Sequence, residues 1–303
     1  MVLSLLMIYT DRHRSALAQA DPYSSGAGCE KGGPGLALDH TRRGARRSAA
    51  DGAKLATRRL RAHLAQLYGN LALRLARPLT RAIDDTMFGH YRQVESLIGL
   101  YETLDIEFPL PAMRNWTVSP DFAREVACVI AETRPETIVE IGSGVSTLIA
   151  GYALRKNGTG SVVSLEHDAA WLARCARLIE EHGLSKEASV VHAPLRTTTI
   201  DGAQWQWYET DGLGRVASID LLVVDGPLGS LQALARYPAL PVLIHLLSPE
   251  AVVMLDDADR PDERQIVARW DREFGPFVIE RPPTEKGCAI LRRRLEARYT
   301  RGD

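Results

Sequence analysis

Two glycines follow a short apolar segment and precede a segment with helical character. Thr137–Ile141 is predicted to form a buried strand, Gly142 and Gly144 come next, and a helix is expected over Val145–Lys156. Glycines at this place let the backbone approach a ligand closely. The first turn of the helix also offers free N–H groups and a positive dipole end to a carboxylate or phosphate. The pattern therefore indicates a binding loop for a small anionic group.

An acidic residue ends the next predicted strand. Ser161–Glu166 closes with Glu166, 24 residues after Gly142, where an acidic side chain can hold a ribose diol. Its alternative role is a helix N-cap, which suits Asp168 better. The third glycine of the dinucleotide fingerprint GxGxxG is Thr147 here, which disfavours a nicotinamide or flavin nucleotide. Together these features predict an adenosine-type pocket at the carboxyl ends of neighbouring strands.

Three aspartates end two further apolar segments. Asp225 is the last residue of Ile219–Asp225. Asp256 is the last residue of Ala251–Asp256, and Asp257 follows it directly. Because the carboxyl ends of parallel strands open on one edge of a sheet, these carboxylates are expected to converge beside the same pocket. Three interpretations stay open. The aspartates bind a hard cation such as Mg²⁺, one of them acts as a general base without metal, or they order turns.

An alternation of strands and helices is expected to position these residues. Strands are expected over Thr137–Ile141, Ser161–Glu166, Ala188–His192, Ile219–Asp225 and Ala251–Asp256, with Phe277–Glu280 and Cys288–Leu291 as a closing hairpin. Helices are expected over Gln93–Leu104, Pro120–Thr133, Val145–Lys156, Ala169–His182 and Pro261–Phe274, and Leu228–Leu247 is expected to be mostly helical with an interruption near Pro238 and Pro241. Repeated strand–helix units predict an α/β fold with a doubly wound, Rossmann-like sheet. The sheet should be mostly parallel, with a C-terminal antiparallel hairpin and helices on both faces.

At this point the sequence resembles the class I S-adenosylmethionine-dependent methyltransferases, of the O-methyltransferase-like, methyltransferase-24 type. The resemblance covers about residues 115–293 and is carried by VEIGSGVST, SLEHD, IDLLVVDGP, AVVMLDDADR and FVIERPPTEKGCAIL. It implies S-adenosylmethionine as the cofactor. By position, the residues expected at that cofactor are Glu140, Gly142, Ser143, Gly144, Ser146, Glu166, His167, Pro194 and Asp225. Ser146 would meet its carboxylate, Glu166 its ribose and Pro194 its adenine.

The three aspartates also look like the cation site of metal-dependent O-methyltransferases, catechol-type and sugar-type. In those enzymes the metal orients a hydroxyl group and lowers its pKa. The catechol-type enzymes have a lysine shortly after the first aspartate, where this chain has Gly226–Gly229 without lysine, so catechol is disfavoured. The resemblance implies O-methylation of a small-molecule or sugar hydroxyl. Asp225, Asp256 and Asp257 would be the catalytic residues and, in one interpretation, the ligands of Mg²⁺.

Two other functions compete with methyl transfer. A nucleotide-linked, NAD-type oxidoreductase would use a similar sheet, but Thr147 speaks against it. A non-catalytic partner protein would keep the cofactor fold without transferring a methyl group. A nucleic-acid partner is disfavoured, because the predicted catalytic domain is acidic and lacks an Asn/Asp-Pro-Pro-Tyr/Phe motif. Trp116 lies just upstream of that domain's first helix, either as part of a lid over the cofactor or as a packing residue.

The net charge of −1 over 303 residues hides an asymmetry. Residues 1–83 hold 14 Arg and Lys against 5 Asp and Glu, which leaves 23 against 33 for residues 84–303. Residues 1–53 are expected to be a disordered basic arm, and 84–303 the methyltransferase domain. Leucines at helical spacing make 54–83 a basic amphipathic helix. It touches a membrane surface or a partner, docks on the following domain, or presents a solvated charged face.

The cysteines and the hydropathy pattern indicate the compartment. The four cysteines are far apart and form no CxxC pair, which argues against a zinc site or a disulfide scaffold. No apolar run approaches the ~20 residues of a membrane span, and no signal peptide is expected at Met1. A cytoplasmic protein is therefore expected, and its oligomeric state is left open.

Overall fold

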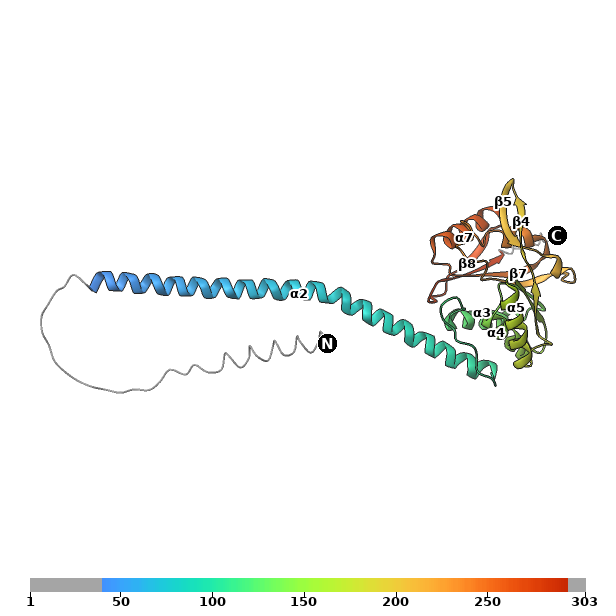
Figure 1. Cartoon of the computed structure of the whole chain (residues 1–303), viewed down its shortest axis with the longest axis horizontal. Coiled ribbons are helices and arrows are strands. Elements are labelled where there is room, and N and C mark those ends of the chain that lie inside the picture. The colour runs from blue at the N-terminus through green and yellow to red at the C-terminus, as the bar shows by residue number, and fades with distance from the viewer. Residues whose placement is uncertain (1–39, 294–303) are drawn as a thin grey trace, which may run out of the picture. The chain divides into compact units, whose positions relative to one another are not determined.

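The computed structural model describes residues 40–293, with side chains from residue 51 onward, and divides the chain into two compact units, 1–76 and 77–303. The 65-residue helix α2 (His40–Leu104) includes the end of the first unit and the start of the second (Figure 1). Of the predicted disordered arm, residues 1–39 lie outside the described residues. Residues 40–53 differ from the prediction: they are helical, because alanine and arginine favour helix and no proline interrupts them.

A seven-stranded sheet in the order β3-β2-β1-β6-β7-β9-β8 forms the second unit's centre. Its strands are β1 (Thr137–Ile141), β2 (Ser161–Glu166), β3 (Ala188–His192), β6 (Ile219–Val224), β7 (Leu247–Asp256), β8 (Phe277–Glu280) and β9 (Cys288–Arg293). Neighbouring strands from β3 to β7 are parallel, whereas β9 is antiparallel to both β7 and β8. The order of the strands reverses between β1 and β6. The predicted α/β fold with a mostly parallel sheet and an antiparallel hairpin is confirmed.

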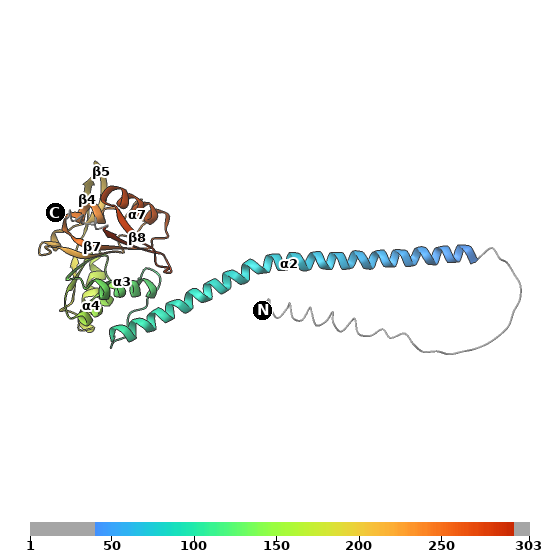
Figure 2. The same ribbon diagram turned by 180° about the vertical axis from the view of Figure 1, so that it is seen from behind.

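Helices cover both faces of this sheet. They are α3 (Pro120–Thr133), α4 (Val145–Asn157), α5 (Ala169–Glu181), α6 (Ala239–Leu243) and α7 (Pro261–Phe274), with single 3₁₀ turns at Asp211–Leu213 and Ile244–Leu246. Figures 1 and 2 both show α3 and α4 on one side of the sheet and α7 on the other. Each side has its own apolar core. Both faces of the central strands are therefore buried, which explains their continuous apolar sequences.

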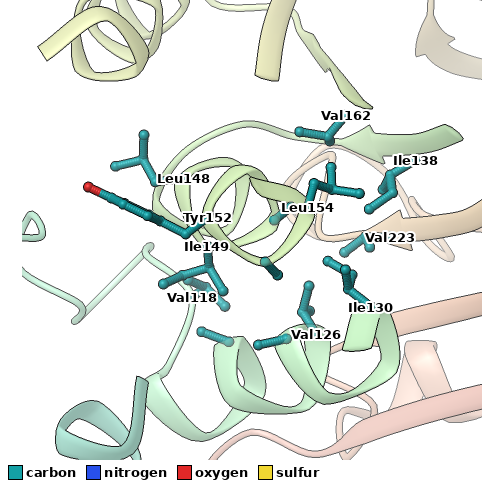
Figure 3. Packing of buried hydrophobic residues seen from close by; sticks show 14 of the residues in the cluster. Val118, Val126, Ile130, Ile138, Leu148, Ile149, Tyr152, Leu154, Val162 and Val223 are labelled. Atoms are coloured by element: carbon teal, nitrogen blue, oxygen red, sulfur yellow. The ribbon is translucent and has the colours of Figure 1, made fainter. Parts of the chain in front are cut away.

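The core between the sheet and α4 is tightly closed. Ile138, Val162 and Val223 project from three neighbouring strands toward Leu154 of α4 and Ile130 of α3 (Figure 3). All five side chains are buried. Burying a side chain of this size stabilises a fold by about 1.5–3 kcal/mol. This packing fixes β1 and α4, and with them the loop that joins the two elements.

Two segments differ from the sequence prediction. Leu228–Leu247 has only the short α6 and one 3₁₀ turn, because Pro238 and Pro241 limit continuous helix. The hairpin of β4 (Leu195–Ile200) and β5 (Ala203–Tyr208) was not predicted. Its two-residue turn is Asp201-Gly202, both with positive φ, as the tight hairpin turn requires. Within the described residues, no helix is both long and apolar enough to cross a membrane.

Candidate active site

A cavity of about 610 Å³ opens outside the carboxyl ends of β1 and β6, where the strand order reverses. In open α/β sheets this is the place where ligands bind. Seven of the predicted cofactor residues line the cavity, namely Gly142, Ser143, Gly144, Ser146, Glu166, His167 and Asp225. The structure thus brings together side chains from three different strand ends.

The two glycines of the loop are needed for its shape. Gly142 has φ +89°, and a Cβ at this residue would lie 3.4 Å from the backbone nitrogen of Gly226. Gly144 has φ +157°, which L-residues rarely adopt, and it immediately precedes α4. The first N–H groups of α4 have no partner within the helix and point toward the cavity end of its axis. The donors available to a bound anionic group are therefore the first N–H groups of α4 rather than those of the loop, which bond to Leu165, Glu166 and Thr147.

Glu166 is buried at the cavity wall and is held in place by the same loop. Its Oε2 accepts hydrogen bonds from the Ser143 backbone nitrogen at 3.3 Å and from Ser143 Oγ at 2.9 Å. Its Oε1 accepts from the Asp168 backbone nitrogen at 2.9 Å and lies 3.2 Å from His167 Nδ1. Asp168 Oδ1 accepts from the Trp171 nitrogen at 2.7 Å, so Asp168 caps α5 as the sequence suggested. Glu166 is thereby left to face the cavity.

Glu140 does not line this cavity, contrary to its predicted role. Its Oε2 accepts hydrogen bonds of 2.5 Å from the hydroxyls of Thr147 and Ser164 in the interior beneath the loop. Thr147 Oγ1 in turn accepts from the Gly144 backbone nitrogen at 3.0 Å. The threonine at the third glycine position thus links the loop to a buried carboxylate. Its hydroxyl supplies hydrogen bonds that a glycine could not.

Glu140 gives the first testable prediction. Burial raises the pKa of its carboxyl from 4.5 to about 7, despite hydrogen bonds from Ser146, Ser164 and Thr147. Because the folded state holds this proton more tightly, the contribution to stability is complete below pH 4.5 and is lost as the pH rises through about 7. Between pH 5 and pH 8 the loss is about 2 kcal/mol. Glu140→Gln should remove this pH dependence.

The measurement is chemical unfolding of the cofactor-free protein at several pH values. Glu136→Gln is the matched control, because Glu136 is exposed immediately before β1. As the pH rises, wild type and Glu136→Gln should lose the same free energy of unfolding. Both should lose more than Glu140→Gln does. A Glu140→Gln profile parallel to that of wild type would show that Glu140 is ionised in both states.

Two aromatic residues complete the first cavity, and the sequence analysis did not assign them to it. Trp171 Nε1 donates to the Ser143 carbonyl oxygen at 2.8 Å, and its ring lies under the guanidinium of Arg174. Tyr208, at the end of β5, is buried and packs edge-on against His167. A tryptophan in the first helical turn after an acidic strand end was the available signal for Trp171. Tyr208 depends on the unpredicted hairpin.

A second cavity of about 460 Å³ adjoins the first, and Asp225 and Trp116 line both. Its remaining wall carries charges of both signs, from Arg236, Asp257, Arg260, Asp262, Glu263 and Lys286. Lys286 Nζ donates to the carbonyl oxygens of Asn115 at 3.3 Å and Thr117 at 3.1 Å. The segment that carries Trp116 is therefore fixed by a residue from the loop between β8 and β9. Trp116 itself is 81% exposed.

The three predicted aspartates do converge, but around an arginine. One carboxylate oxygen from each of Asp225, Asp256 and Asp257 lies within 4.8 Å of the others. Arg236 is buried among them: its Nη2 lies 3.2 Å from Asp225 Oδ1 and 2.8 Å from Asp257 Oδ2. Its Nη1 donates to the Asp256 carbonyl oxygen at 2.9 Å. A guanidinium thus bridges the two carboxylates that a divalent cation would bridge.

The three carboxyl groups are not equivalent. Asp225 lines both cavities, Asp257 lines the second, and Asp256 lines neither. Burial, reinforced by the two neighbouring aspartates, raises the pKa of Asp256 well above its usual range. Burial also raises the pKa of Asp225 to about 6, although Arg236 opposes the shift. Asp256 is therefore a structural neighbour of the site rather than a wall residue, and the other two face the cavities.

Two further residues differ from the predicted site. Pro194 does not line the first cavity. Arg236 was missed because the segment around it was predicted only as a mostly helical stretch interrupted near Pro238 and Pro241, without a role for its side chains. A signal was present in the sequence, since Arg236 interrupts the apolar stretch from Ala233 to Leu240. A single arginine in such a stretch indicates a buried cation with carboxylate partners.

Part of the chain is similar to known proteins. Residues 139–258 match a family model described as a methyltransferase domain. A search of curated proteins finds no match. Similar solved structures include the methyltransferase PaMTH1 of Podospora anserina bound to SAH, with 15% identity, a TM-score of 0.48, and coverage of 66% of this chain and 88% of that one. The O-methyltransferase of Bacillus cereus in complex with SAH shows 18% identity and a TM-score of 0.44, covering 66% and 91%.

The O-methyltransferase TomG of Streptomyces achromogenes, in complex with SAM, shows 17% identity and a TM-score of 0.44, covering 67% of this chain and 89% of TomG. Similarities this low carry no argument about function. Residues 139–258 match a methyltransferase domain, and the sheet around them is Rossmann-like and mostly parallel. The oxidoreductase alternative is not favoured.

Proposed function

We propose that the protein methylates a hydroxyl group of a small molecule or sugar, with S-adenosylmethionine in the first cavity and the acceptor in the second. The observation that carries this proposal is the position of Asp225, which lines both cavities. A group at that border can contact an acceptor hydroxyl where it meets the methyl donor. The charged and polar wall of the second cavity suits an acceptor rich in hydroxyl groups.

The first cavity fits the cofactor in three respects. The positive-φ glycines leave room against the backbone, the N-terminus of α4 suits a carboxylate, and the buried Glu166 suits a ribose diol. When bound, S-adenosylmethionine supplies a methyl group that its sulfonium charge already activates. The chain's own residues have to orient the acceptor oxygen and exclude water.

Asp225 is proposed as the general base. Its pKa of about 6 leaves it mostly ionised at neutral pH and still able to accept a proton from a hydroxyl. Arg236 and, through it, Asp257 hold the carboxylate in place. In the alternative interpretation, Mg²⁺ would be held by Asp225, Asp256 and Asp257 and would lower the pKa of the hydroxyl. The position of Arg236 favours the base without metal.

The test combines cofactor binding with an acceptor panel. Labelled S-adenosylmethionine should bind and NADH should not, and release of S-adenosylhomocysteine should require a hydroxyl compound rather than its amine analogue. The rate should fall as the pH drops below about 6, because Asp225 becomes protonated, and Asp225→Asn should abolish turnover while cofactor binding persists. Binding of NADH instead would support the oxidoreductase. Cofactor binding without transfer across a broad panel would support the non-catalytic partner protein.

Metal removal gives a separate prediction. Because Arg236 already bridges Asp225 and Asp257, EDTA should leave the rate of methyl transfer unchanged. Added Mg²⁺ should likewise leave the melting temperature unchanged. A loss of turnover on chelation that Mg²⁺ restores would instead establish the metal-dependent interpretation.

A further inference from the structure

We propose that residues 53–76 of α2 bind the surface of a membrane that contains anionic lipids. This inference is independent of the proposed methyl transfer. It concerns the blue part of α2 in Figure 2 and rests on a row of leucines and on the charge beside it. The leucine stripe consists of Leu60, Leu64, Leu67, Leu71 and Leu75.

The leucine stripe is a continuous apolar face. At 100° per residue its five side chains fall within about 80° of the helix circumference. Their exposed fractions lie between 43% for Leu64 and 69% for Leu75. Large apolar side chains gathered on one exposed face indicate an interaction surface. Leu55 and Leu73 are also exposed, at 52% and 55%, but they lie on the opposite side of the helix.

Positive charge borders the stripe on both sides. Lys54 and Arg61 follow one edge, Arg59 and Arg74 lie beyond the other, and all are exposed. The sequence has no Asp or Glu from residue 52 to residue 83, so Arg59, Arg61 and Arg74 have no acidic residue three or four positions away in the helix, whereas Asp51 lies three residues before Lys54. An apolar face with basic borders is the pattern of a helix that lies in the plane of a membrane. Anionic head groups complement its charge.

A second copy of this chain is the main competing occupant, and the charge distribution argues against it. Two such helices joined along their stripes would place one basic border against another, because neither border contains an acidic residue. A coiled coil usually pairs opposite charges at these flanking positions. Here the flanks repel each other, whereas an anionic lipid surface attracts both of them. The basic side chains on both borders of the leucine stripe therefore favour an anionic membrane surface over a second copy of the chain.

The experiment is sedimentation of the full-length chain with vesicles of phosphatidylcholine alone or mixed with phosphatidylserine. Binding should require the anionic lipid and should weaken as salt is raised. Arg61→Gln with Arg74→Gln should lower partitioning by roughly 25-fold, about fivefold per residue. Leu64→Gln with Leu71→Gln should lower it at least about tenfold, since both leucines lose their apolar contact with the lipid.

Leu55→Gln with Leu73→Gln is the matched control, because it makes the same change at equally exposed leucines outside the stripe. It should retain vesicle binding. All variants should also retain cofactor binding, which reports an intact methyltransferase domain. No sedimentation with anionic vesicles, or equal loss in both leucine pairs, would overturn the proposal. So would a concentration-dependent dimer in analytical ultracentrifugation that forms without vesicle binding and depends on Leu64 and Leu71.

Discussion

Replacing Arg236 by methionine should lower the free energy of unfolding by about 3–5 kcal/mol, the usual cost of removing one partner from a buried ion pair. The arginine is 2% exposed and contacts the carboxylates of Asp225 and Asp257 at 3.2 and 2.8 Å. Methionine fills most of the volume but removes the buried cation, so that the half-buried Asp225 loses its ion pair with Arg236 and the buried Asp257 keeps only the exposed Arg260. Chemical unfolding at neutral pH measures the change.

The control for this variant is Arg260→Met. Arg260 also contacts Asp257, at 2.9 Å, but its side chain is 48% exposed. An exposed pair contributes about 0–1 kcal/mol, so this variant should stay close to wild type. Adding Asp257→Asn to Arg236→Met should restore part of the lost stability, because the uncompensated charge is removed. Equal effects of the two arginine variants would show that Arg236 does not neutralise the aspartates.

The second large effect is expected at the glycine loop. Gly144→Asp should weaken binding of S-adenosylhomocysteine by at least about 100-fold, or about 2.7 kcal/mol. The new side chain would strain a backbone with φ +157° and would bring a carboxylate to the cavity next to Trp171. It would also oppose the carboxylate of the ligand at the N-terminus of α4. Isothermal titration calorimetry measures the affinity.

Gly158→Asp makes the same change at the other end of α4. Gly158 also has a positive φ, +76°, and open space around it. Its variant should bind S-adenosylhomocysteine within about threefold of wild type, even where stability falls by about 0.5 kcal/mol from the charge at the helix C-terminus. Comparable loss of affinity in both variants would mean that the effect is on folding rather than on the binding loop.

The parts of the fold that the sequence predicted are those with strong periodicity. The bounds of β1, β2, β3, α3, α7 and β8 agree with the predicted ranges. Buried parallel strands have continuous apolar sequences, and amphipathic helices have a clear period. The β4–β5 hairpin was missed although Asp201-Gly202 is a typical tight-turn pair. Its second strand, Ala203–Tyr208, does alternate glutamine with apolar residues, but the first, Leu195–Ile200, contains three successive threonines and lacks that alternation.

The site was predictable where it depends on strand ends. Gly142, Glu166 and Asp225 lie where the topology requires them, at the end of a parallel strand. Glu140 does not line the cavity because it lies before the end of its strand and its carboxylate is bound beneath the loop by Thr147 and Ser164, contacts that a single sequence does not reveal. Arg236 could not be placed, because its segment has little regular structure and its position depends on long-range ion pairs.

The two cavities are built from different parts of the chain. In the second cavity, Lys286 joins remote segments through its hydrogen bonds to Asn115 and Thr117. The glycine loop, Glu166 and Trp171 come from one short stretch of chain, 142–171, whereas the second cavity is assembled from remote segments near residues 115, 236, 260 and 286. Under the proposed function, substitutions near residues 236, 260 and 286 would change the acceptor cavity without touching the glycine loop. Acceptor preference could then diverge while the methyl donor stayed the same.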